Sequence, residues 1–119
     1  MYKFERLEVY QMALTYTDMI YGLAEKLPRS EEHNLQSQII RAATSVVLNI
    51  AEGSTSQSDN EQRRFLTMAL RSLMETVACG HLIQRRKYVK EEDLAKMYEY
   101  SQKLFGKLQA MRHRLTNDR

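Results

Sequence analysis

The chain has 119 residues and a formal net charge of +3 at pH 7, a length sufficient for one domain with one hydrophobic core. It holds one proline, four glycines and no run of about 18 apolar residues, a composition that argues against a sheet-rich, disordered or membrane-spanning protein. Residues 1–6 also lack the basic-then-apolar pattern of a secretory signal. We therefore expect a single helical domain over residues 1–119, located in the cytoplasm.

Helical periodicity predicts four segments, in chain order at residues 5–27, 31–52, 59–86 and 91–116. Pro28, the stretch 53–58 and the charged stretch 87–90 separate them. Because these connections are short, neighbouring helices should run antiparallel. The predicted fold is an all-α, up-down-up-down four-helix bundle.

Local sequence signals predict where the second and third helices begin and end. Ser30 is expected to cap the second helix, and Gly53 suits the position just after its last turn. Ser58 and Glu61 have the spacing of a capping box, in which each side chain satisfies a backbone amide of the other residue.

The first and fourth segments carry apolar residues at alternating spacings of four and three, which is the periodicity of a bundle core. In the first segment this core line comprises Val9, Ala13, Tyr16, Ile20, Leu23 and Leu27. A second apolar face adjoins it, made of Leu7, Tyr10, Leu14 and Tyr21, and the fourth segment adds Tyr98 and Phe105. Since one core cannot cover all of these side chains, we predict an oligomer interface there. The alternative is that the tyrosines border the core with their hydroxyls in water.

The chain lacks the usual sequence signs of an enzyme or metal site. His33, His81 and His113 fall on different segments without metal-ligand spacing, and neither a phosphate-binding loop nor a nucleophile elbow is present. Cys79 is the single cysteine, and its apolar neighbours predict a buried, inert thiol rather than a reactive one. We therefore predict no catalytic residue, metal or cofactor.

A polar line on the second helix is the one candidate for a chemical site. It comprises Arg41, Ser45, Leu48 and Glu52, with Asn49 beside it. Because nothing near it in sequence supplies a nucleophile or a base, a hydrogen-bonded seam between subunits is the favoured interpretation. On the third helix, Glu75 follows Arg71 by four residues, which predicts an ion pair within that helix.

Positive charge is concentrated in the second half of the chain. Residues 1–60 hold 5 Lys and Arg against 8 Asp and Glu, whereas residues 61–119 hold 13 against 7. Two groups suggest phosphate binding: a strip on the fourth helix and a cluster at the end of the third. The strip on the fourth helix consists of Lys96, Lys103, Lys107 and Arg114. The cluster at the end of the third helix consists of Arg85, Arg86 and Lys87. The alternative interpretation is an ordinary solvated surface.

Residues 41–53, RAATSVVLNIAEG, resemble the hallmark of the four-helix-bundle family of 23S rRNA intervening-sequence proteins, sometimes labelled ribosomal proteins. The motif residues are Arg41, Ser45, Asn49, Glu52 and Gly53. The stretch 4–11 resembles the family's opening, Leu27-Pro28 its first turn, and the region from Arg64 to Glu75 its third helix. Arg71 departs from the pattern, since many relatives have glycine before the serine.

This resemblance implies a bundle that assembles into a ring, typically a homopentamer, in a bacterial cytoplasm. A similar fold occurs in accessory proteins of diversity-generating retroelements, whose basic pentamers bind reverse transcriptase and nucleic acid. The resulting prediction is a non-enzymatic, oligomeric protein associated with RNA. The alternative is a protein-binding scaffold for a nucleic-acid enzyme, without direct nucleic-acid contact. A third hypothesis, an enzyme using the polar line of the second helix, has little support.

Overall fold

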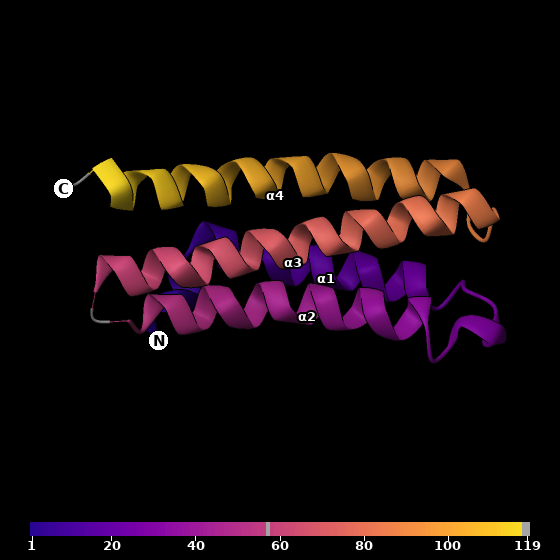
Figure 1. Ribbon diagram of the computed structural model, residues 1–119, viewed down its shortest axis with the longest axis horizontal. Helices are drawn as coiled ribbons and strands as arrows, with labels where there is room; N and C mark the ends of the chain where they lie inside the picture. Colours follow the sequence, from indigo (N-terminus) through magenta and orange to yellow (C-terminus); the bar gives the residue numbers. More distant parts are fainter. Residues whose placement is uncertain (57, 118–119) are drawn as a thin grey trace.

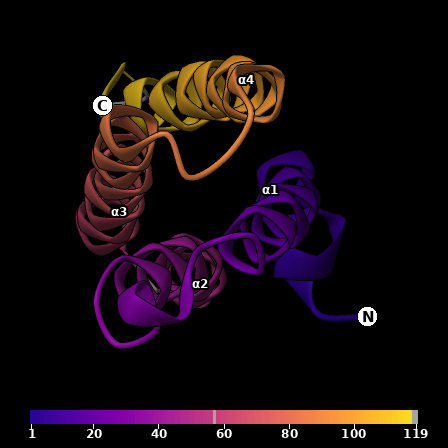
Figure 2. The ribbon, with the colours of Figure 1, turned by 90° about the vertical axis from the view of Figure 1, so that its right-hand side faces the viewer.

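The computed structural model describes residues 1–56 and 58–117. Its long elements are α1 (Glu8–Ala24), α2 (Leu35–Ser54), α3 (Asp59–Arg86) and α4 (Glu91–Asn117), with short 3-10 helices η1 (Lys3–Arg6) and η2 (Arg29–Glu31). Successive long helices run in opposite directions along a bundle of 47 × 22 × 21 Å (Figure 1). Viewed along that axis, they occupy four corners in chain order (Figure 2). The described residues contain no strand, so the predicted all-α four-helix bundle is confirmed.

The core follows the predicted periodicity. All six residues of the first core line are buried, and α4 buries Leu94, Met97, Ser101, Leu104 and Leu108 at the same spacing. Full burial of a leucine or isoleucine contributes about 1.5–3 kcal/mol. Together with the buried residues of α2 and α3, these two lines form the core that stabilises the bundle.

Tyr16 is a polar side chain within this core. It is completely buried, and its hydroxyl lies 2.7 Å from Thr76 Oγ1 on α3, which in turn donates to the Leu73 carbonyl at 2.6 Å. Burial raises the pKa of Tyr16 to about 12, although the Thr76 hydrogen bond opposes that shift. The phenol is therefore neutral at physiological pH, and its hydrogen bond joins α1 to α3 across the core.

Two helix boundaries differ from prediction. Ser30 does not cap a helix, because residues 29–31 form η2 and α2 begins at Leu35. The Glu31 carboxylate in η2 accepts hydrogen bonds from the Tyr88 hydroxyl at 2.9 Å and from Asn34 Nδ2 at 2.9 Å. These contacts hold the segment before α2 as a separate turn.

Gly53 also differs from prediction, since it lies inside α2, is buried and has no positive φ. Its ideal Cβ would lie 2.9 Å from the Cβ of Phe65 on α3. The glycine is therefore needed for close packing of α2 on α3 rather than for a left-handed turn.

The start of α3 agrees with prediction in its position and in one of the two hydrogen bonds of the predicted capping box. The Ser58 hydroxyl accepts the Glu61 amide at 3.1 Å, and α3 spans Asp59–Arg86 as expected. The predicted turn between α2 and α3 includes Gln57, which lies outside the described residues. Since Ser58 satisfies one of the unpaired amides of the first turn, the helix start is encoded locally.

Candidate functional site

The predicted polar line on α2 makes its hydrogen bonds within the chain. Asn49 Nδ2 donates to Ser45 Oγ at 3.0 Å and to the Ser45 carbonyl at 2.9 Å, while Ser72 Oγ on α3 donates to Ser45 Oγ at 2.9 Å. Arg41 and Glu52 are exposed on the outer side. The hydrogen bonds of Ser45 therefore connect α2 to α3 within one chain, and a seam between subunits stays a prediction for the exposed Arg41 and Glu52.

This arrangement has none of the features of an activated nucleophile. The side-chain partners of the Ser45 hydroxyl are an amide and a second hydroxyl, and neither can act as a general base. Cys79 is buried, and burial raises the pKa of its thiol, as does the nearby Glu75 carboxylate. Among the described residues, no group of three or more His, Cys, Asp or Glu side chains could hold a metal ion.

The basic strip on α4 is partly neutralised by acidic neighbours. Lys107 Nζ lies 3.1 Å from Glu8 Oε1 on α1, and Lys103 Nζ lies 3.7 Å from Glu99 Oε1 one turn earlier on α4. Lys96 and Arg114 are exposed on the same helix. Two of the four predicted phosphate contacts are therefore already engaged in surface ion pairs.

The cluster Arg85, Arg86 and Lys87 has a different environment. All three side chains are exposed, and none forms an ion pair with the described residues. Lys87 ends α3 in the left-handed conformation, with φ 59°. Arg85 and Arg86 occupy the last helical turn, where positive charge is favoured by the helix dipole. The structure thus brings the three cations together at the junction of α3 and α4.

The second apolar face of α1 divides into two parts. Leu7 and Tyr10 are partly buried against the core, and the Tyr10 ring meets Phe4 of η1 edge-on at 4.9 Å between centroids. Leu14 and Tyr21 are 37% and 47% exposed. The prediction that one core cannot cover this face therefore applies to Leu14 and Tyr21, while Leu7 and Tyr10 mainly join η1 to the bundle.

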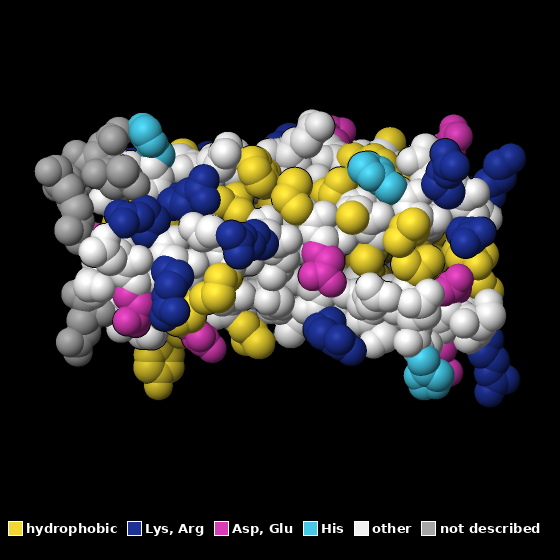
Figure 3. Space-filling model, in the orientation of Figure 1, with side chains coloured by type: hydrophobic (Ala, Val, Ile, Leu, Met, Phe, Trp, Pro, Cys, Tyr) yellow, Lys and Arg dark blue, Asp and Glu magenta, His cyan; other side chains and the backbone are white. Residues whose placement is uncertain are grey.

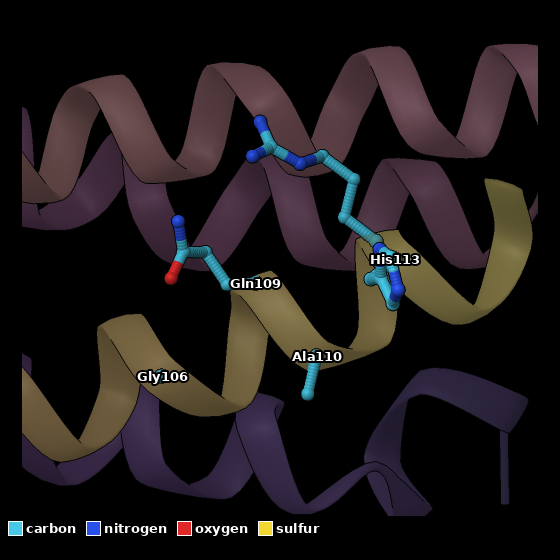
Figure 4. Close-up of a pocket in the computed structure, with 5 residues that line it drawn as sticks. Gly106, Gln109, Ala110 and His113 are labelled. Carbon is cyan, nitrogen blue, oxygen red and sulfur yellow. The ribbon is translucent and has the colours of Figure 1, made fainter.

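A groove between α3 and α4 was not predicted from the sequence. One hollow of about 500 Å³ is lined mainly by Met74, Val77, His81, Tyr98, Phe105 and Gly106. A second hollow begins at Gly106 and continues along α4 to His113 (Figure 4). The second hollow is lined by α4 alone, but both hollows include Gly106, and we call the two together the α3–α4 groove. Figure 3 shows hydrophobic side chains gathered between α3 and α4 midway along the bundle, with Lys and Arg toward both ends.

The signals for this groove were only partly visible in the sequence. In the sequence, Tyr98 and Phe105 are apolar residues outside the core line of the fourth helix. Both side chains line the groove. By contrast, no sequence pattern marked Met74 and Leu82, which are 42% and 53% exposed on α3. The predicted ion pair between Arg71 and Glu75 is absent from the described residues, so Arg71 is exposed beside the groove without a partner.

The family model for the 23S rRNA-intervening sequence protein matches residues 5–110, which is most of the chain. The chain belongs to this family. The resemblance seen in residues 41–53 is thereby confirmed, and in this member of the family the matched motif lies along the α2–α3 contact.

One solved structure supports the same assignment. It is a protein of unknown function from the S23 ribosomal protein family of Bacteroides thetaiotaomicron, with 26% sequence identity and a TM-score of 0.80. The match covers 87% of this chain and 96% of that one. No curated protein shows significant sequence similarity to the chain. In the described residues, every helix is too short or too polar to cross a membrane.

Proposed function

We propose that this protein is a non-enzymatic homo-oligomer, acting in a bacterial cytoplasm, that binds RNA through basic side chains at the end of α3. The observation that carries the proposal is the exposed cluster Arg85, Arg86 and Lys87, which has no ion-pair partner among the described residues. Arg86 is close enough to Glu31 to help lower the pKa of that carboxyl, but none of the three cations has a carboxylate of the described residues within ion-pair distance. They therefore remain available to phosphates, whose binding releases counterions. The family's name, which refers to an intervening sequence of 23S rRNA, supports RNA as the ligand.

The α4 strip is assigned a secondary role. Lys103 and Lys107 must leave Glu99 and Glu8 before they can contact a phosphate. Exposed pairs of this kind contribute about 0.2–1 kcal/mol each, so the exchange is possible but reduces the net gain. Lys96 and Arg114 extend the basic surface along α4 and would add contacts to a longer RNA.

The proposal of a non-enzymatic protein rests on the state of the reactive groups. The Ser45 hydroxyl lacks a base, and the Cys79 thiol is buried with a raised pKa. Self-association rests on Leu14 and Tyr21, which expose apolar surface that water solvates poorly. The number of subunits implied by the resemblance, five, is part of the proposal.

The test is binding of a fluorescent 20-nucleotide single-stranded RNA, followed by anisotropy between 50 and 200 mM salt. Three phosphate contacts predict a log–log salt slope of about −2, at roughly −0.7 per contact, which is close to a twenty-fold loss of affinity over this range. Replacing Arg85 and Arg86 by Glu should weaken binding at least ten-fold and flatten the slope by about 1.4.

The control is Lys3→Glu with Arg6→Glu, which changes the net charge equally at η1, near the opposite end of the bundle (Figure 1). It should retain most of the affinity, because its charges lie far from the cluster. If both double variants lose affinity equally, binding reflects net charge alone and the assigned surface is wrong. If the wild-type protein does not bind RNA at 50 mM salt, the protein-scaffold alternative replaces this proposal.

A further inference from the structure

Two exposed apolar surfaces lie on opposite sides of the bundle. The first, which we call the α1 ridge, consists of Leu14, Asp18, Tyr21 and Glu25. The second is the α3–α4 groove. Because the helices occupy four corners in chain order, the outer side of α1 faces away from the edge where α3 meets α4 (Figure 2). A molecule with two different apolar surfaces on opposite sides can associate head to tail.

The two surfaces carry opposite charge. Residues 7–25 contain three acidic residues and no lysine or arginine, and Asp18 and Glu25 make no ion pair with the described residues. Residues 59–90, which include α3, contain seven Lys and Arg against three acidic residues, Asp59, Glu61 and Glu75. Arg71 is exposed one turn from Met74 at the border of the groove. Electrostatic complementarity of this kind selects partners and fixes their orientation.

The spacing of side chains also matches. On the α1 ridge, Leu14 and Tyr21 are seven residues apart, and so are Asp18 and Glu25, which gives parallel apolar and acidic lines. On α3, Met74 and His81 are seven apart, beside a basic line at Arg64, Arg71 and Arg85. Lines that repeat every seven residues remain in register when two helices pack at a shallow angle.

The dimensions of the two surfaces are compatible. The 17 residues of α1 span about 25 Å at 1.5 Å per residue. The α4 residues that line the groove, from Tyr98 to His113, span about 22 Å. Gly106 has no atom within 4 Å of its ideal Cβ position, so a neighbouring helix can approach α4 closely there. Met74 is flexible and can adapt to an inserted side chain.

We propose that the α1 ridge of one copy docks into the α3–α4 groove of the next copy. Leu14 and Tyr21 enter the apolar lining, and Asp18 and Glu25 face the basic line of α3. The occupant is a second copy because this chain itself supplies an acidic, apolar helix of matching length and spacing. This inference rests on the self-association proposed above and adds to it the identity and the heterologous geometry of the contact.

The experiment uses one variant defective on each surface. The ridge variant is Leu14→Glu with Tyr21→Glu. The groove variant is Gly106→Leu with Met74→Glu, which fills the groove and repels the acidic ridge. The matched control is Gln38→Leu with Thr55→Glu, which makes the same change in net charge as the groove variant at two exposed positions near the ends of α2, outside both surfaces.

Light scattering at 50 µM protein measures the mass of each species. Wild type and control should share one oligomeric mass, whereas each defective variant alone should have the mass of one 14.0 kDa chain. An equal mixture of the two defective variants should form a complex of two chains and nothing larger. The intact groove of the ridge variant can receive the intact ridge of the groove variant, and this is the one junction that remains possible. Formation of that complex also shows that both variants fold.

Other outcomes overturn the inference in separable ways. If wild type is oligomeric but the mixture remains monomeric, the ridge and groove are not partners, although self-association stands. If the groove variant keeps the wild-type mass, the contact is ridge to ridge or lies elsewhere. If wild type itself is monomeric at 50 µM, the self-association proposed above fails, and the docking proposal fails with it. RNA binding is measured independently and is unaffected by these outcomes.

Discussion

Each of the four long helices contains one glycine, and the surroundings of the four glycines predict opposite effects of the same substitution. Gly22 and Gly106 have nothing within 4 Å of an ideal Cβ. At Gly53 that atom would lie 2.9 Å from Phe65 Cβ, and at Gly80 it would lie 2.7 Å from Met97 Cε and 3.0 Å from Tyr98 Cε1. Replacing each glycine by alanine in turn therefore separates the effect of helix propensity on stability from the effect of helix packing.

The magnitudes follow from these distances. In a helix interior, alanine is favoured over glycine by about 0.5–1 kcal/mol. Gly22→Ala should stabilise the protein by up to that amount, and Gly106→Ala should do so in the ridge variant, in which no second copy covers α4. At Gly53 the neighbouring atom is the first side-chain carbon of Phe65, which cannot rotate away, so α2 and α3 must separate. Inserting an extra methyl group into such a packed contact costs about 1–3 kcal/mol. Because Gly53 is next to the last residue of α2, the higher helix propensity of alanine offsets little of this cost. We expect Gly53→Ala to cost about 1–2 kcal/mol.

Gly80→Ala should be intermediate, since Met97 Cε is the end of a flexible side chain but is 1% exposed in a packed core. The assay is thermal unfolding by circular dichroism at one fixed protein concentration, because association makes the midpoint depend on concentration. A change of 1 kcal/mol shifts the midpoint by about 4 °C in a protein of this size. A Gly53→Ala protein as stable as wild type would refute the close α2–α3 packing described here.

Two further predictions concern stability. Tyr16→Phe removes the hydrogen bond to Thr76 but leaves Thr76 bonded to the Leu73 carbonyl, so it should cost about 0.5–1.5 kcal/mol in urea unfolding; a cost above about 3 kcal/mol would contradict this account. The hydrogen bond from Lys26 holds the pKa of the Asp93 carboxyl below its usual range. This contact therefore stabilises the folded protein above a pH of about 4, the usual pKa of an aspartate, and the stabilisation is lost as the pH falls through the lower pKa of the folded state. Asp93→Asn should therefore reduce the loss of thermal stability between pH 5 and pH 3, and an unchanged pH profile would show that this contact does not matter.

The bundle itself was predictable because each core line is a local periodicity. The spacing of Val9, Ala13, Tyr16 and Ile20 is visible within four turns, and the structure buries all of them. The turn before α2 was not predictable in this way. Tyr88, 57 residues from Glu31 in sequence, binds the Glu31 carboxylate and contributes to holding residues 29–34 out of the helix.

The interaction surfaces were predictable only where a local periodicity within one helix defines them. The heptad spacing of Leu14 and Tyr21 predicts an apolar line, but that line cannot reveal that η1 folds back to cover Tyr10 with Phe4. The α3–α4 groove combines Met74 with Phe105 from a different helix, so no single segment contains its pattern. Likewise, the role of Gly53 depends on its distance to Phe65, which sequence periodicity does not encode.

The motif that identifies the family serves the structure in this chain. Ser45 and Asn49 are hydrogen-bonded at the α2–α3 contact, and Gly53 allows the same two helices to approach at Phe65. Groups engaged in this way cannot also bind a substrate without breaking the contact that they support. The exposed charges do not have this constraint, since Asp18, Glu25 and Arg71 form no ion pair with the described residues. Function in this protein should therefore be sought among the exposed side chains rather than at Ser45, Asn49 and Gly53 of the α2 motif.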